Sequence, residues 1–132
     1  MGLDTNKKLV SDTWGAVSNG DVQGFMNNLS EDVTWTFFGS HRFAGIITGK
    51  EELVSKLFAP LGEVLDGGIK VQIDSMIAEG DRVVIEARGE AKTKTGRRYD
   101  NSYCIVITVR NNKISAVREY LDSELVTAVF GK

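Results

Sequence analysis

The segment from Ile69 to Asp122 decides the fold, and it ends in the sequence Asn111-Asn112-Lys113-Ile114-Ser115-Ala116-Val117-Arg118-Glu119-Tyr120-Leu121-Asp122. Stretches rich in β-branched residues alternate there with turn residues, which predicts strands that return on one another. The two adjacent asparagines are typical of a two-residue hairpin turn. We therefore expect strands over residues 69–73, 83–94, 98–110 and 113–121, with turns at Gly80-Asp81 and Thr95-Gly96.

Two helices and one strand are predicted near the start of the chain. Apolar residues recur at helical spacing in a first helix that ends at Asn19-Gly20, namely Val10, Trp14 and Val17. Asp21 is placed to cap a second, short helix. Residues 33–38 are β-branched or aromatic, which favours a strand.

A third helix is predicted to open at a capping box formed by Thr48 and Glu51. Pro60 should break or kink this helix because proline cannot donate to the helical hydrogen-bond ladder. Residues 123–130 predict a short final helix. Helices segregated to one side of a mostly antiparallel sheet give an α+β fold.

Composition limits the classes of partner and cofactor. A chain of 132 residues is expected to form one domain over residues 1–132. A net charge of -2 without a concentrated basic patch argues against nucleic acid as a partner. The N-terminus has no apolar run for a signal peptide, and no window approaches the roughly 20 apolar residues of a membrane span. One cysteine, Cys104, and one histidine, His41, offer no metal-ligand cluster. We expect a cytoplasmic protein with no metal and no membrane partner.

The order of the elements, together with Arg118-Glu119-Tyr120-Leu121-Asp122, resembles the nuclear transport factor 2-like superfamily over nearly the whole chain. Within it, the chain is most similar to SnoaL-like polyketide cyclases, ketosteroid isomerase-like proteins and limonene epoxide hydrolase. The resemblance implies a cone-shaped domain in which a strongly curved sheet wraps three N-terminal helices around a central, largely apolar pocket. It also implies a homodimer and chemistry without a cofactor. Because one fold hosts many reactions, function has to be argued at the site.

Strand pairing decides which charged residues share a face. If Asn111-Asn112 pairs Arg110 with Lys113, Cys104 lies opposite Glu119 and Val106 opposite Val117. A three-residue loop at Thr95-Gly96 places Arg88 opposite Cys104, whereas a two-residue loop shifts the register by one and brings Tyr103 and Tyr120 to the Arg88 face. Both loops remain open from the sequence alone.

The resemblance suggests which of these residues carry chemistry. In a gap-free comparison with limonene epoxide hydrolase, its catalytic arginine and two aspartates fall on Glu86, Arg88 and Glu119. The order Glu86-Ala87-Arg88 is inverted relative to that enzyme, which argues against epoxide hydrolysis. The catalytic base and the acidic oxyanion donor of ketosteroid isomerases fall on Phe37 and Cys104, so that chemistry should be absent.

The predicted site is a general acid or base, Glu119, oriented by Arg88 with Glu86 nearby. The alternative is a structural salt bridge or a solvent-facing stripe. The resemblance places Trp14, Trp35, Phe37 and Phe58 near the pocket wall. The predicted substrate-binding wall comprises these four residues together with Cys104, Val106 and Val117. His41 is a candidate proton carrier at the pocket mouth, and Tyr103 and Tyr120 are candidate donors to a carbonyl.

Val83, Ile85 and Ala87 alternate with Glu86 and Arg88, so we expect them on an outer apolar face that a homodimer covers. The predicted function is binding of a small, mostly apolar molecule with cofactor-free acid/base chemistry of an isomerase, cyclase or hydrolase type. The alternative is a non-catalytic ligand-binding or protein-interaction domain with a structural charge cluster.

Overall fold

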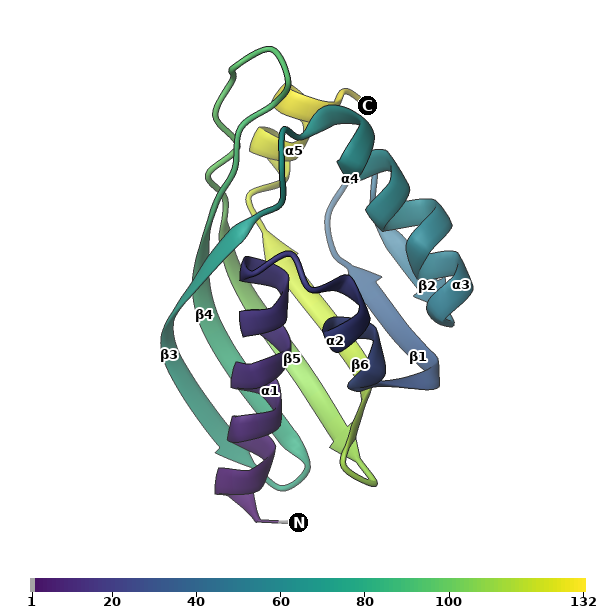
Figure 1. Ribbon diagram of the computed structural model, residues 1–132, viewed down its shortest axis with the longest axis vertical. Helices are drawn as coiled ribbons and strands as arrows, with labels where there is room; N and C mark the ends of the chain where they lie inside the picture. Colours follow the sequence, from purple (N-terminus) through teal and green to yellow (C-terminus); the bar gives the residue numbers. More distant parts are fainter. Residues whose placement is uncertain (1) are drawn as a thin grey trace.

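A computed structural model describes residues 2–132, and Met1, part of the N-terminal segment considered above, lies outside the described residues. A curved six-stranded sheet wraps around helices on its concave side (Figure 1). The elements are α1 (Leu3–Ser18), α2 (Val22–Asn27), β1 (Leu29–Phe37), β2 (Gly45–Thr48), α3 (Lys50–Leu53), the π-helical η1 (Val54–Phe58), α4 (Ala59–Val64), β3 (Lys70–Glu79), β4 (Arg82–Glu90), β5 (Ser102–Arg110), β6 (Lys113–Leu121) and α5 (Ser123–Phe130).

The sheet order is β2-β1-β6-β5-β4-β3, and every neighbouring pair is antiparallel except β1 and β6. This arrangement confirms the predicted α+β, cone-like fold. Two local predictions also hold. Asp21 caps α2 by accepting the Gly24 N–H at 2.9 Å, and Asn111 and Asn112 both adopt positive φ in the hairpin turn. The segment between the strand predicted over residues 33–38 and the third helix contains one further strand, β2, which was not predicted.

The third helix differs from the prediction in its N-terminal cap and in the effect of Pro60. Its N-cap is Gly49 and no side chain caps it, while the Thr48 N–H donates to Glu52 Oε1 at 3.3 Å. Pro60 does not end the helix, because the turn before it widens into the π-helical η1 and the chain continues into α4. A wider turn accommodates a proline, which has no N–H to donate and crowds the preceding turn. The π-helical turn ends at Phe58, one of the residues predicted to form the substrate-binding wall.

The hydrophobic core lies between the concave face of the sheet and the helices. Val83, Ile85 and Ala87 are buried in this core, so the prediction that they form an outer apolar face is wrong. They alternate with Glu86 and Arg88 as predicted, but it is the two charged residues that lie on the outer face. The helices, rather than a second subunit, cover this apolar face of β4.

Both predicted registers of the sheet require correction. The segment between β4 and β5 contains a bridge between Lys92 and Arg98, with residues 93–97 as the loop beyond it. Glu86 therefore lies opposite Cys104 and Arg88 opposite Ser102. The hairpin pairs Arg110 with Lys113 as predicted, but Ser115 forms a β-bulge between the Val109–Ile114 and Thr108–Ala116 pairs. One extra residue reverses the faces of everything beyond it. Glu119 therefore lies opposite Ile105 on the concave face, instead of opposite Cys104.

Candidate functional site

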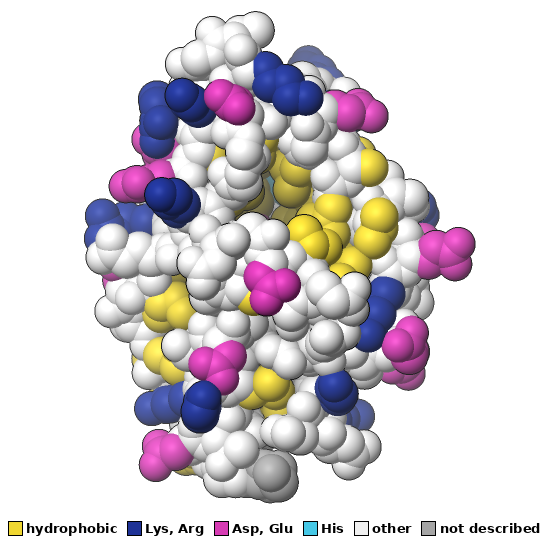
Figure 2. Space-filling model, in the orientation of Figure 1, with side chains coloured by type: hydrophobic (Ala, Val, Ile, Leu, Met, Phe, Trp, Pro, Cys, Tyr) yellow, Lys and Arg dark blue, Asp and Glu magenta, His cyan; other side chains and the backbone are white. Residues whose placement is uncertain are grey.

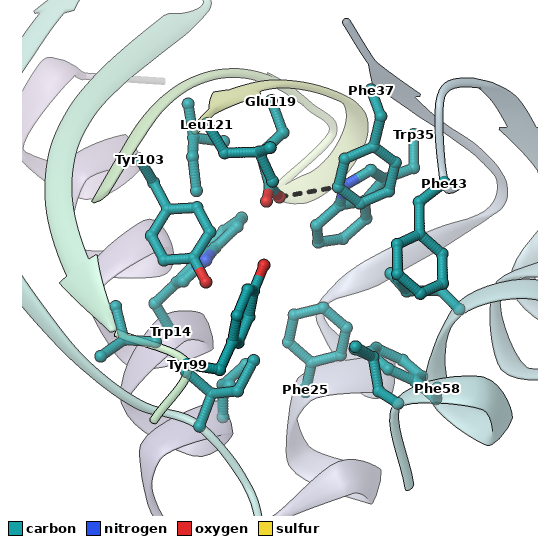
Figure 3. A pocket seen from close by; sticks show the side chains of 16 residues that line it. Trp14, Phe25, Trp35, Phe37, Phe43, Phe58, Tyr99, Tyr103, Glu119 and Leu121 are labelled. Atoms are coloured by element: carbon teal, nitrogen blue, oxygen red, sulfur yellow. Dashed lines mark hydrogen bonds between the residues drawn. The ribbon is translucent and has the colours of Figure 1, made fainter. Parts of the chain in front are cut away.

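A cavity of about 90 Å³ lies between the concave face of the sheet, α1, α2 and the helix that runs from η1 into α4. Half of the residues that line it are aromatic, and Figure 3 shows these rings around a common space: Trp14, Phe25, Trp35, Phe37, Phe43, Phe58, Tyr99 and Tyr103. The rings also contact one another, with 6.0 Å between the ring centroids of Trp14 and Trp35. The structure brings Trp14, Trp35, Phe37 and Phe58 together around this space.

Glu119 is the one acidic side chain among the described residues that line the cavity. It projects from β6, is only 7% exposed, and accepts a hydrogen bond from the Trp35 indole Nε1–H at 3.2 Å. Burial raises the pKa of Glu119 to about 8, although the bond from Trp35 acts in the opposite direction. The carboxyl group is therefore mostly protonated at neutral pH and still ionises within a physiological range.

Two phenol hydroxyl groups face the same space as Glu119, those of Tyr99 and Tyr103 (Figure 3). Burial raises the pKa of both tyrosines, so they remain neutral hydrogen-bond donors. Among the described residues that line the cavity there is no lysine, arginine or histidine. The polar end of the cavity thus consists of neutral donors and a carboxyl group that ionises reluctantly.

Asn101 fixes the hydroxyl group of Tyr99. Its Oδ1 accepts the backbone N–H groups of Ser102 and Asp122 at 2.8 and 3.1 Å, so the Nδ2 end must be the one that faces Tyr99. Nδ2 donates to the Tyr99 Oη at 3.1 Å and to the Asp122 carbonyl at 3.3 Å. Because the Tyr99 oxygen accepts from Asn101, its own hydrogen is free to donate to a ligand.

The ring of Tyr103 lies close against β4 because residue 89 is glycine. A Cβ atom at Gly89 would lie 3.0 Å from Tyr103 Cε2 and 2.9 Å from Ile69 Cγ2. A glycine inside a strand commonly marks such a close approach. We infer that Gly89 is needed for the position of the Tyr103 ring in the cavity wall.

The structure does not bring the predicted charged trio together. Glu86 and Arg88 lie on the convex face, where Glu86 accepts from the Ser75 hydroxyl at 2.8 Å and Arg88 forms a two-bond contact with Asp74 at 2.8 and 3.0 Å. The prediction that they share a face with Glu119 is wrong, because the Ser115 bulge moves Glu119 to the opposite face. An exposed pair of this kind contributes little to stability.

Cys104 and Val106 are also on the convex face, opposite Tyr120 and Arg118, so their assignment to the pocket wall is wrong. Val117 is fully buried opposite Ile107 and belongs to the core, but it does not line the cavity. Tyr120, a candidate donor, instead stacks on Phe38 at the convex face with 4.4 Å between ring centroids. The bulge accounts for the displacement of all the β6 residues beyond Ser115.

His41 is buried and has a partner at each ring nitrogen. Nδ1 accepts the Phe43 N–H at 3.1 Å, so Nε2 carries the hydrogen and faces the Phe38 carbonyl at 3.2 Å. The ring meets Phe37 edge-on, with 5.9 Å between centroids. These contacts hold the loop before β2 in place, and His41 does not line the cavity, so the structure does not support its role as a proton carrier at the mouth.

Tyr99 and Asn101 were missed in the sequence. Both lie in a segment that was expected to be a plain strand, and their signal is the spacing of Tyr99, Asn101, Tyr103 and Ile105 at every second residue. Such spacing places side chains on one face of a strand. Gly89 is a second signal, because a glycine within a strand indicates that another group, here the Tyr103 ring, lies close to the backbone of β4.

Comparison with known proteins agrees with the fold. Residues 10–117 match the SnoaL-like domain family. An uncharacterised protein of Mycobacterium tuberculosis (strain H37Rv) is 24% identical over 127 residues, which cover 96% of each chain. An NTF2-like protein of Burkholderia xenovorans LB400 is 25% identical, with a TM-score of 0.78 and 98% of each chain covered.

A third similar structure is TerC, which was co-crystallised with polyporic acid. It is 18% identical, its TM-score is 0.82, and the match covers 97% of this chain and 99% of TerC. At this identity the likeness shows the fold alone. The family match spans most of the chain, and this protein therefore belongs to the SnoaL-like domain family of the nuclear transport factor 2-like superfamily.

Proposed function

We propose that this protein binds an uncharged, mostly apolar molecule in the aromatic cavity and moves a proton on that molecule through Glu119. The observation that carries the proposal is the buried carboxyl group of Glu119, whose pKa is raised to about 8 by burial beside two phenol donors. A group with a pKa near the working pH is the most effective acid or base catalyst. TerC, which shares the fold, was crystallised with a small molecule.

The proposed step needs only the groups of this chain. The ionised form of Glu119, about one molecule in ten at pH 7 for a pKa near 8, removes a proton from a carbon next to a carbonyl group. The negative charge moves to the carbonyl oxygen, which accepts hydrogen bonds from Tyr99 and Tyr103. The protonated Glu119 then returns the proton to the same or a neighbouring carbon, and the indole N–H of Trp35 holds the carboxyl group in place throughout.

Binding without turnover is the second candidate, and one observation favours it. Among the described residues lining the cavity, none is a cation that would neutralise a charged intermediate. Such a protein would hold its ligand by burial of apolar surface and by the two tyrosines. Both functions use the same cavity. They are separated by an assay that measures ligand binding and turnover together.

The test is exchange of hydrogen for deuterium in D₂O at the carbon next to the carbonyl group of neutral ketones, followed by NMR. The protein should accelerate exchange, and the rate should rise with pH around a midpoint near 8, because only the ionised carboxyl accepts a proton. Ketones that quench the fluorescence of Trp14 and Trp35 but do not exchange would establish binding without turnover. A rate that is flat between pH 6 and 10 would contradict the role of Glu119.

We also propose that the protein forms a homodimer through the convex face of the sheet. Apolar side chains run across that face, where Ile77 pairs with Val84 and Val84 with Val106. Ile77 is 67% exposed and Tyr120 is 41% exposed. An exposed apolar face of this kind is typical of an interface between subunits, and a two-fold axis would let it cover itself.

Light scattering at micromolar concentration should give twice the 14.5 kDa of one chain. Ile77→Glu should weaken the dimer by at least about tenfold, because it would bury unpaired charges at the interface. The matched control is Val54→Glu, a change at an exposed apolar residue of η1, far from that face in the fold. A monomeric native chain, or equal effects of the two changes, would exclude this interface.

A further inference from the structure

A second cavity of about 250 Å³ adjoins the aromatic cavity on the helical side. It lies between the end of α1, α2, α4 and the turn before β3, and we call it the groove. Figure 2 shows hydrophobic side chains gathered around a hollow on this face of the molecule. Residues lining both spaces are Val17, Phe25, Phe58, Leu61 and Ile69, so the groove continues the inner cavity toward the surface.

The inner cavity by itself is too small for the ligand that its walls suggest. A cavity of about 150 Å³ is the size that holds benzene in a protein core, and the inner cavity measures about 90 Å³. A molecule with a ring or a chain of several carbons must therefore extend beyond it. The groove, which shares its walls, is the adjoining space that is large enough to receive the remainder.

Polar groups are confined to one end of this combined space. Glu119, Tyr99 and Tyr103 lie at the inner end. Among the described residues that line the groove, every side chain is apolar or is a glycine. A ligand that matches both ends has an uncharged oxygen-bearing head and an apolar tail, because no cation among the described lining residues balances an anion and the one carboxyl group is mostly protonated at neutral pH.

We propose that the groove is a subsite for the apolar tail of a neutral carbonyl compound whose oxygen lies at Tyr99 and Tyr103. This inference rests on the proposed ligand binding in the inner cavity. Phe25 and Phe58 stand at the junction, edge to face with 5.5 Å between their centroids, and Phe58 belongs to the π-helical turn of η1. The tail leaves the inner cavity past this pair.

The probe series is the straight-chain methyl ketones from butanone to dodecan-2-one, with binding measured by calorimetry and by fluorescence of Trp14 and Trp35. Affinity should increase by roughly fourfold for each added methylene until the groove is filled, and then stay level, because each buried methylene contributes a constant transfer free energy. Affinity that does not change with chain length would overturn the subsite.

Gly62→Leu tests the location. Gly62 lies in α4, lines the groove but not the inner cavity, and a Cβ atom there meets no other atom within 4 Å. The leucine should weaken binding of the longest ketones by at least about tenfold, the loss of two or more buried methylenes, and leave butanone within twofold. The matched control is Gly15→Leu in α1, where a Cβ atom also meets open space and which lines neither cavity.

Equal losses for short and long ketones in Gly62→Leu would overturn the assignment, as would equal effects of Gly62→Leu and Gly15→Leu. If Gly62→Leu does not fold, Val22→Phe narrows the groove from α2 at an exposed position and should give the same selective loss. Failure of the acid/base proposal is a separate result: chain-length dependence would persist while Glu119→Gln left deuterium exchange unchanged. Loss of chain-length dependence with exchange intact would reject the subsite alone.

Discussion

Replacing Glu119 with glutamine should lower the rate of ketone deuterium exchange by about 10²–10⁴-fold, the usual contribution of a general acid or base. Glutamine keeps the shape of the side chain, and its amide oxygen still accepts the hydrogen bond that Trp35 donates at 3.2 Å. It has no proton to gain or lose in the physiological range. Affinity for the ketone, measured by tryptophan fluorescence, should therefore change by less than about threefold, under 1 kcal/mol.

The matched control is Glu86→Gln, which makes the same chemical change on the convex face of the sheet. Glu86 contacts the Ser75 hydroxyl and does not line the cavity, so its replacement should leave exchange within twofold of the native rate. Equal rates in the native protein and Glu119→Gln would show that the carboxyl group does not act as the base. Equal losses in both variants would point to a general effect of charge.

The same Glu119→Gln change should stabilise the protein at alkaline pH. Burial raises the folded-state pKa of Glu119 from 4.5 to about 8, so between these values the folded state binds the proton more tightly than the unfolded state does. The native protein therefore loses stability as pH rises through this window, by at most about 5 kcal/mol when the carboxyl is fully ionised. Glutamine stays neutral at every pH, so the variant does not lose stability in this way.

Urea unfolding at pH 5, 7 and 9 measures this effect. The difference in unfolding free energy between Glu119→Gln and the native protein should increase from pH 5 to pH 9 in favour of the variant. Glu86→Gln should show no such increase. If the native protein and Glu119→Gln lose stability in parallel over this range, Glu119 does not carry a raised pKa in the folded state.

The order of the elements was predictable because it depends on local signals. Hydrophobic periodicity, the cap at Asp21 and the turn at Asn111-Asn112 each specify structure over a few residues. The α+β architecture follows from that order, whereas the prediction that aromatic side chains from α1, β1 and η1 surround one space came from the family resemblance. Length and composition contributed the expectation of a single domain.

The residues that face one another across the sheet were not predictable, because each inserted residue shifts the strand register for every residue beyond it. Ser115 adds one residue to β6, and this reverses the face of Glu119 relative to Cys104. The connection over residues 93–97 displaces Arg88 from Cys104 to Ser102. No local signal in Ser115-Ala116-Val117 distinguishes a bulge from a regular strand, and a gap-free comparison with a related enzyme conceals it.

The reasons that predict a catalytic role for Glu119 from the sequence therefore hold only in part. Its predicted partner Arg88 lies on the other face with Asp74, and its burial comes from the aromatic cavity instead. The neutral donors Tyr99 and Tyr103 take the place that the sequence assigned to a guanidinium group. The presence of neutral donors in place of a cation changes the expected chemistry. A nearby cation lowers the pKa of a carboxyl group, whereas an apolar, neutral site raises it.

The proposed chemistry requires that Glu119 is a buried carboxyl group with a pKa near 8 in an apolar cavity. The most direct test is an NMR titration of the Glu119 side-chain carboxyl carbon in protein labelled with ¹³C at glutamate, with Glu119→Gln to assign the resonance. We expect a single transition with a midpoint near pH 8, well above those of the exposed glutamates. A midpoint at or below the ordinary value of 4.5 would contradict the proposed role of Glu119.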